Sequence, residues 1–106
     1  MDNLYQSRFL KKEENSSEIE IVFANKEHEI FQAHFPTNQL LPGFLQIDII
    51  SQILSKKIVS IKKAKFLQPI LPNDIIIFYT QDKEKTTKVI AKKDGKKYSE
   101  FSFVSK

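Results

Sequence analysis

The feature that most constrains the fold is one segment, from Gly43 to Ile58, in which apolar residues recur at helical spacing on two faces. The two stripes consist of Phe44, Ile47, Ile50, Leu54 and Ile58, and of Leu45, Ile49 and Ile53. A helix that is apolar on most of its circumference must be buried widely, instead of resting on one flat surface. We therefore predict a helix from Gly43 to about Ile58, enclosed by the rest of the chain.

The segments on both sides of this helix alternate between apolar and polar residues, as β-strands do. We expect strands over residues 5–12, 18–23, 64–69, 75–80, 86–91 and 98–104. Asp94-Gly95 is a hairpin signal, and residues 27–42, which carry two prolines and no sustained period, are expected to form a loop. An antiparallel sheet curled around one long central helix satisfies this order, so the predicted fold class is α+β, with residues 1–106 as a single domain.

Composition restricts the class of protein further. No apolar run approaches the roughly 20 residues that span a bilayer, and the start of the chain lacks the pattern of a secretion signal. Cysteine is absent, which excludes disulfides and thiolate metal sites. We expect a cytoplasmic protein. The net charge of +4 favours acidic partners, among them nucleic acid or an acidic carrier protein, but no base-stacking motif or grouped arginine supports nucleic-acid binding.

The residues around the expected helix start could form a proton-transfer site. His34 lies in the loop before the helix and titrates near neutrality, which suits a general base. Pro42 has no N–H, so Gly43 and Phe44 are the natural backbone donors at the helix N-terminus. Such donors can hold an oxygen that gains negative charge during a reaction.

An acidic residue follows within the same helix. Asp48 is flanked by Ile47 and Ile49, so we expect its carboxyl group to lose hydration and to carry a proton. Gln52, one turn further on, could orient that carboxyl group by a hydrogen bond. Together with the histidine and the backbone donors, the acid completes a set of groups for general acid–base chemistry.

The stretch from Phe31 to Asp48, with Gln52, resembles the β-hydroxyacyl-acyl carrier protein dehydratases of the hotdog fold. That family has a histidine in a His-Phe-Pro-like loop, a Pro-Gly step, an acid five residues after the glycine and a glutamine four residues later. His34, Gly43, Asp48 and Gln52 match this spacing without a gap.

Residues 63–74 also resemble the strand and Pro-containing turn of the family, so the resemblance covers roughly residues 20–103. Ala33 and Gln39 depart from the glycine and proline usual in the loop. The acid is Asp48, whereas the commonest branch carries glutamate. The chain is most similar to the short dehydratases of aryl-polyene and related specialised lipid pathways.

The resemblance implies dehydration of a 3-hydroxyacyl thioester, held on the phosphopantetheine arm of acyl carrier protein, to a trans-2-enoyl thioester. By that analogy His34 removes the α-proton, the Gly43 N–H holds the thioester oxygen and Asp48 protonates the departing hydroxyl group. No metal or redox cofactor is implied. The family pattern also implies at least a homodimer, with the histidine and the acid from opposite subunits. We expect Lys62, Lys63 and Lys65 to meet the acidic carrier protein.

Two other functions stay open at this point. In a hotdog acyl thioesterase, the carboxylate would activate water for hydrolysis, although the His-Phe-Pro loop argues against that class. A non-catalytic protein that binds acyl chains or carrier protein would keep the same scaffold. The departures at Ala33 and Gln39 are compatible with this second alternative.

Overall fold

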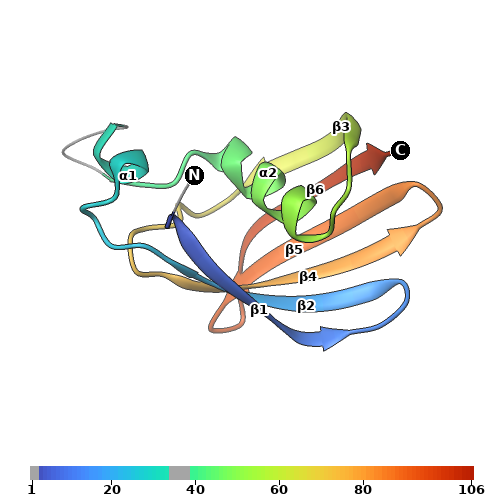
Figure 1. Cartoon of the computed structure of the whole chain (residues 1–106), viewed down its shortest axis with the longest axis horizontal. Helices are drawn as coiled ribbons and strands as arrows, with labels where there is room; N and C mark the ends of the chain where they lie inside the picture. Colours follow the sequence, from blue (N-terminus) through green and yellow to red (C-terminus); the bar gives the residue numbers. More distant parts are fainter. Residues whose placement is uncertain (1–2, 34–38) are drawn as a thin grey trace.

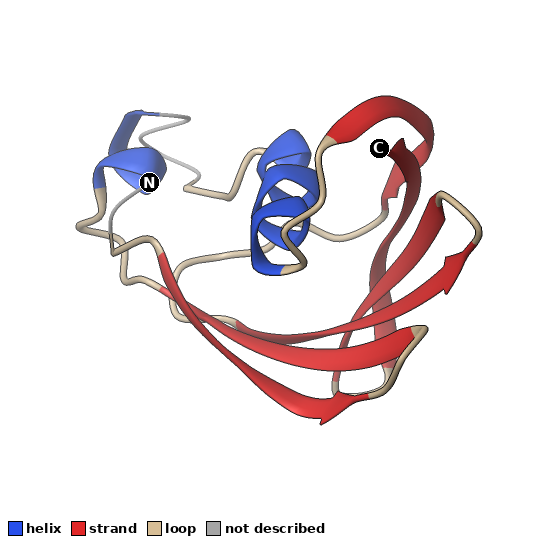
Figure 2. Ribbon diagram, turned by 45° about the vertical axis from the view of Figure 1, so that its right-hand side comes forward, coloured by secondary structure: helices blue, strands red, loops and turns tan. Residues whose placement is uncertain are grey.

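The computed structural model describes residues 3–33 and 39–106, and six strands within these residues form one antiparallel sheet. The strand order is β1-β2-β4-β5-β6-β3, which leaves β1 and β3 as the two edges. The strands are β1 (Tyr5–Lys12), β2 (Ser16–Phe23), β3 (Ile58–Phe66), β4 (Ile75–Lys83), β5 (Thr86–Lys93) and β6 (Lys96–Ser105). The sheet curls around the helix α2 (Gly43–Ile53), which lies on its concave side (Figures 1 and 2). The predicted α+β class, with a curled antiparallel sheet around one helix, is therefore confirmed.

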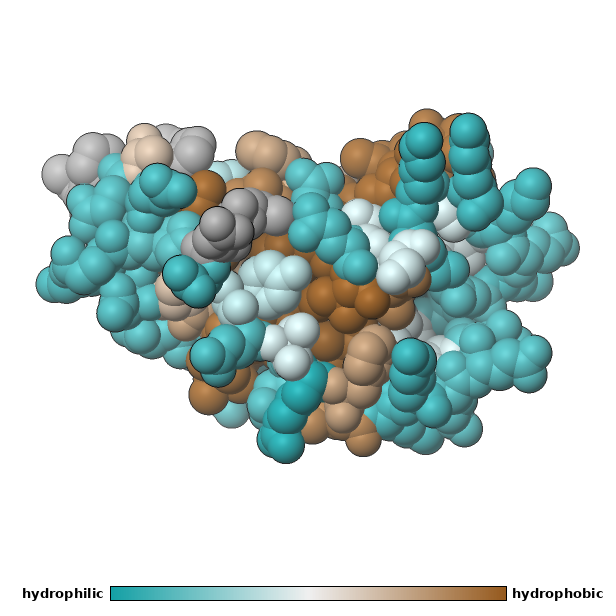
Figure 3. All heavy atoms as spheres, in the orientation of Figure 1, coloured by the Kyte–Doolittle hydropathy of each residue, from teal (hydrophilic) through white to brown (hydrophobic). Residues whose placement is uncertain are grey.

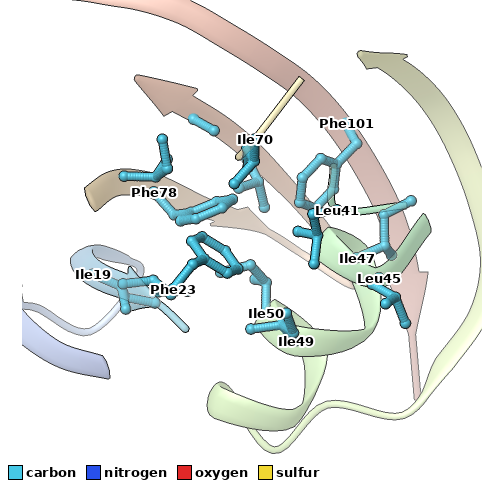
Figure 4. Close-up of a cluster of buried hydrophobic side chains, with 14 of the residues drawn as sticks. Ile19, Phe23, Leu41, Leu45, Ile47, Ile49, Ile50, Ile70, Phe78 and Phe101 are labelled. Carbon is cyan, nitrogen blue, oxygen red and sulfur yellow. The ribbon is translucent and has the colours of Figure 1, made fainter. Parts of the chain in front are cut away.

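The core lies between α2 and the concave face of the sheet. Figure 4 shows Ile49 and Ile50 of the helix directed towards aromatic side chains from the strands. The buried apolar side chains of the helix and its sheet neighbours include Leu45, Ile47, Ile49, Ile50, Ile19, Ile21, Phe23, Phe78, Phe101 and Phe103. Most apolar side chains of the helix are thus buried as predicted, whereas Phe44, at its first turn, is 59% exposed. Among the described residues, no helix is long and apolar enough to cross a membrane.

The prediction that α2 continues to about Ile58 was wrong, because the helix ends at Ile53. Ser55 has a φ of 55°, in the left-handed region. Its N–H donates to the Gln52 carbonyl oxygen at 3.1 Å, and the N–H of Lys56 donates to the Ser51 carbonyl oxygen at 2.8 Å. These two hydrogen bonds form a Schellman motif, which satisfies the last helical carbonyl groups and turns the chain away.

Because the helix ends earlier than predicted, the next strand also begins earlier in the sequence. The expected strand over residues 64–69 is in fact β3, which begins at Ile58 and ends at Phe66. Beyond Phe66 the N–H groups of Leu67 and Gln68 both donate to the Tyr98 carbonyl oxygen, at 2.9 and 3.1 Å, which ends regular pairing with β6.

The expected loop over residues 27–42 contains a one-turn helix, α1 (Glu29–Ala33). His28 caps it, because its Nδ1 atom accepts a hydrogen bond from the Ile30 N–H at 3.0 Å. A side chain that accepts from the second helical N–H satisfies a donor that has no partner within the helix. One helical turn is too short to show a periodic pattern, so α1 could not be predicted from apolar spacing.

The predicted hairpin at Asp94-Gly95 is confirmed, since it joins β5 to β6. Asp94 and Gly95 have φ angles of 51° and 79°. Two consecutive residues with positive φ match the twist of the flanking strands, which is why Asp-Gly favours this turn. The hairpin aligns β6 so that Ser99, Phe101 and Phe103 are buried.

Candidate active site

The start of α2 offers the backbone donors that the sequence predicts. Pro42 is the N-cap residue, and its side chain provides no capping hydrogen bond. The first backbone bond within this turn runs from the Leu45 N–H to the Pro42 carbonyl oxygen, at 3.0 Å. Among the described residues no acceptor is recorded for the N–H groups of Gly43 and Phe44. Both groups are therefore available to a ligand oxygen at the positive end of the helix.

The aromatic ring of Phe66 packs against Gly43. A Cβ atom placed at position 43 would lie 2.7 Å from Phe66 Cδ2 and 2.9 Å from Phe66 Cγ, well inside van der Waals contact. A glycine at position 43 allows the close approach of a substrate to the backbone, as expected from the sequence. The structure adds a second reason within the chain, since a larger residue would displace the Phe66 ring.

A groove of about 360 Å³ opens beside this contact. Its walls come from the residues before α2, from the first turn of the helix and from the segment that follows β3. The lining residues are Leu40, Leu41, Gly43, Gln46, Phe66, Leu67, Gln68, Pro69 and Ile70. Gln46 and Gln68 are the polar residues of this set, Gly43 has no side chain, and the others are apolar. The groove therefore suits an apolar ligand with a polar group near the helix N-terminus.

Two residues of this site were missed from the sequence. Gln46 is only 2% exposed, and its Oε1 atom accepts a hydrogen bond from the hydroxyl group of Ser99 on β6 at 2.6 Å. The available signals were a glutamine inside an apolar stripe of the helix and a serine at an inward strand position that otherwise carries phenylalanine. Read together, the two polar residues could have indicated a buried pair.

Asp48 lies on α2, but its side chain is exposed in the single chain, so the expected loss of hydration was wrong at this level. Ile47 and Ile49 are buried, yet successive residues of a helix point about 100° apart. Sequence neighbours therefore do not cover the carboxyl group. Gln52, one turn later, is also exposed, so the two residues lie on one exposed face of the helix, and the expected hydrogen bond between them stays a prediction. The described residues of this chain therefore leave the carboxyl group of Asp48 exposed.

The remaining site residues predicted from the sequence are His34 and the three docking lysines. His34, the expected general base, lies outside the described residues, and its place relative to Asp48 stays a prediction. The three expected docking lysines lie on the edge strand β3 and are exposed. Among them, Lys63 is already paired, since its Nζ atom contacts Glu100 at 2.7 Å. Lys62 and Lys65 have no ion pair with a described residue.

Glu100 joins two lysines at the junction of β3 and β6. Lys63 and Lys97 donate hydrogen bonds to its two carboxylate oxygens, at 2.7 and 2.5 Å. These hydrogen bonds, from Lys63 first and then Lys97, lower the pKa of Glu100 to about 2. The triad joins the edge strand β3 to β6 and reduces the positive charge that β3 presents.

Several apolar side chains near α2 and β3 are left uncovered. Figure 3 shows brown, hydrophobic atoms along the upper side of the molecule, where Figure 1 places β3, and near its middle. Those that are more than half exposed are Phe44, Val59, Ile61 and Leu67. A cluster of this kind beside an unpaired strand edge is typical of a protein–protein interface.

The curled sheet and the enclosed helix define a hotdog protein, and the open helix N-terminus beside an apolar groove is its candidate ligand-binding site. Comparisons with known proteins then give its family. Residues 10–102 match the family described as ApeI-like, ApeI dehydratase. This chain belongs to the ApeI-like dehydratase family, which confirms the predicted resemblance to the specialised-pathway hotdog dehydratases.

Curated relatives support this assignment. In an alignment 125 positions long, the chain is 31% identical to the 3-hydroxyacyl-[acyl-carrier-protein] dehydratase FabZ of Lactococcus lactis subsp. lactis. The alignment covers 96% of this chain and 83% of that enzyme. It is 33% identical over 66 residues to FabZ of Levilactobacillus brevis, where the match spans 50% of this chain and 45% of the enzyme.

Solved structures confirm the hotdog fold. A chain of the dehydratase heterocomplex ApeI:P from Xenorhabdus doucetiae superposes with a TM-score of 0.80 at 21% identity, covering 99% of this chain and 98% of that chain. An uncharacterized protein from Erwinia carotovora subsp. atroseptica gives a TM-score of 0.66 at 21% identity, covering 100% and 97% of the two chains.

Proposed function

We propose that this protein dehydrates a 3-hydroxyacyl thioester carried by acyl carrier protein, and forms the trans-2-enoyl thioester and water in a lipid-type biosynthetic pathway. The observation that carries the proposal is the open N-terminus of α2, where the Gly43 and Phe44 N–H groups border an apolar groove. The names of the curated FabZ relatives support the substrate class.

In the proposed reaction His34 takes the α-proton of the substrate. The C–H electron pair moves into the thioester, and its oxygen gains negative charge that the Gly43 N–H stabilises. The electron pair then forms the Cα–Cβ double bond as the C–O bond to the β-hydroxyl group breaks, and Asp48 donates a proton to the leaving oxygen, which releases water. His34 ends with one extra proton and Asp48 with one fewer, and exchange with solvent restores both groups.

We propose a homodimer, or a larger homo-oligomer, as the active form. Asp48 is exposed in the single chain, and β3 is an edge strand with the uncovered side chains Val59 and Ile61. Pairing of two copies along β3 would bury these side chains. It would also cover the polar face of α2, so that Asp48 could meet His34 of the partner subunit in a site with little water.

The test is the reverse reaction, hydration of a trans-2-enoyl thioester on acyl carrier protein, followed by loss of enoyl absorbance. His34→Ala and Asp48→Ala should each abolish turnover, whereas Glu27→Ala, a surface control, should retain it. Unchanged turnover in either variant would reject the assigned roles. Release of free carrier thiol would identify a thioesterase, and binding without turnover by the wild-type protein would identify a non-catalytic acyl-binding protein.

A further inference from the structure

Gln46 uses only part of its hydrogen-bonding capacity within the chain. Its Oε1 atom accepts from Ser99, but among the described residues no acceptor is recorded for Nε2. Every fully enclosed side-chain nitrogen or oxygen atom in the described residues does have a partner. The Nε2 group of this buried side chain is therefore accessible from the groove that Gln46 lines.

The helix directs this amide towards the same end of the groove as the backbone donors. Side chains of an α-helix lean towards its N-terminus, and residues three apart are neighbours on its surface. Gln46 is three residues after Gly43 and lines the same groove. Its amide thus lies over the turn that begins at Gly43, and both residues offer N–H groups to one region.

The chemistry of the groove limits what can accept these hydrogen bonds. Leu40, Leu41 and Phe66 are among the apolar side chains that surround the amide. An apolar ligand that displaces water from the groove would leave this amide without an acceptor, unless the ligand supplies an oxygen of its own. A ligand with an apolar chain and an acceptor oxygen at its head fits this combination, and an acyl thioester is such a ligand.

We propose that Gln46 is a further catalytic residue, whose Nε2–H donates a second hydrogen bond to the thioester oxygen held by the Gly43 N–H. This role rests on the proposed dehydratase function. The hydrogen bond strengthens as the oxygen gains negative charge, so it stabilises the enolate more than the bound substrate. The Ser99 hydroxyl group donates to Oε1 at 2.6 Å, which is a structural contact within the chain that leaves Nε2 for the ligand.

Three variants separate contact with the substrate from a structural role. Gln46→Glu keeps an oxygen for Ser99 but removes the donor, Gln46→Met removes both, and Ser99→Ala leaves the donor in place. We expect both Gln46 variants to lower kcat by about 100-fold, in line with loss of one oxyanion donor. Ser99→Ala should lower the melting temperature as much as Gln46→Met while it retains most of kcat. Equal losses of kcat in Ser99→Ala and Gln46→Met would overturn the proposal.

A spectroscopic measurement tests the contact without turnover. The infrared carbonyl band of a saturated acyl thioester, labelled with ¹³C at the carbonyl carbon, should shift to lower frequency on binding to the wild-type protein. In Gln46→Glu the shift should shrink, and in Ser99→Ala it should persist. An unchanged shift in Gln46→Glu would overturn the role of Gln46. A wild-type protein that shows the shift but no hydration activity would instead refute the proposed function.

Discussion

The Phe66 ring and Gly43 are packed so closely that no side chain fits between them, since a Cβ atom at position 43 would lie 2.7 Å from the ring. Phe66 is itself 43% exposed and forms part of the groove wall. The first helical turn and the end of β3 therefore define the candidate oxyanion site jointly. A change at either residue alters the position of the other.

Gly43→Ala should reduce kcat by about 10- to 100-fold, because displacement of the ring or of the helix start by even 1 Å misaligns the substrate. The double variant Gly43→Ala/Phe66→Ala should recover part of the activity by removing the clash. Steady-state hydration of an enoyl thioester measures the activity of both variants.

Gly95→Ala is the matched control. It should lower stability because Gly95 has a φ of 79°, yet leave kcat unchanged. Full activity of Gly43→Ala would contradict the role of the close contact.

Substitution on the edge strand tests the proposed assembly. Val59→Lys should prevent pairing along β3, because it places a charge in a surface that would otherwise bury an apolar side chain, at a cost of about 1.5–3 kcal/mol. Sedimentation velocity should show monomers, and hydration activity should be lost. Ile75→Lys changes an exposed isoleucine on β4 and should preserve assembly. A fully active monomer of Val59→Lys would contradict a site shared between subunits.

Charge reversal on β3 tests carrier-protein docking. Lys62→Glu/Lys65→Glu should raise the apparent KM for a carrier-linked substrate by about 3- to 10-fold, through loss of electrostatic attraction. A small thioester mimic should be unaffected, because it has no acidic protein surface. Lys63 is left unchanged, since its ion pair with Glu100 makes it structural. Lys85→Glu, on the turn between β4 and β5, serves as control. Equal changes in KM for both substrates would rule out docking at these lysines.

Acid should weaken the fold through Glu100. Hydrogen bonds from Lys63 and Lys97 lower the pKa of this carboxyl group from 4.5 to about 2. Stability from this carboxylate is therefore complete above about pH 4.5 and is lost as the pH falls towards 2. Glu100→Gln should flatten this part of the profile of melting temperature against pH, relative to the wild type and to Glu27→Gln. A profile with unchanged slope would show that the triad does not contribute.

The helix end offers a stabilising substitution. Ser55 holds a φ of 55°, which is unfavourable for residues with a Cβ atom. Ser55→Gly should raise the free energy of unfolding by about 0.5–1 kcal/mol, since glycine adopts this conformation without a steric penalty. Thermal denaturation would record a rise of a few degrees, whereas Ser7→Gly, within β1, should lower the melting temperature. A fall in melting temperature for Ser55→Gly would refute this explanation.

Much of the fold could be predicted, because the spacing of apolar residues along the sequence indicates which faces of helices and strands are buried. Apolar residues on two faces of α2 required enclosure, and alternation identified most strands. The end of the helix was not predictable from the same pattern, since Leu54 and Ile58 continue the apolar spacing beyond Ile53. What ends the helix is the left-handed conformation of Ser55, and serine carries no strong sequence signal for that conformation.

The candidate site was predictable only in part. The spacing of Gly43, Asp48 and Gln52 placed backbone donors and a polar face on one helix. The pairing of Gln46 with Ser99 depends on contacts between residues 53 positions apart, and the packing of Phe66 on Gly43 likewise requires the tertiary fold. Asp48 is exposed in the single chain, because the residues that flank it in the sequence are not the residues that cover a helical side chain.

If two copies pair along the edge strand β3, as proposed, the activity per chain depends on the protein concentration. Association of two chains is a second-order process, so output per chain would fall steeply on dilution, even with every site intact. At low expression, newly folded chains would remain monomeric for longer. Their unpaired edge strand β3 would then be open to pairing with any other extended segment. Expression level would then act as a control on specific activity, and purified samples would need comparison at matched concentration.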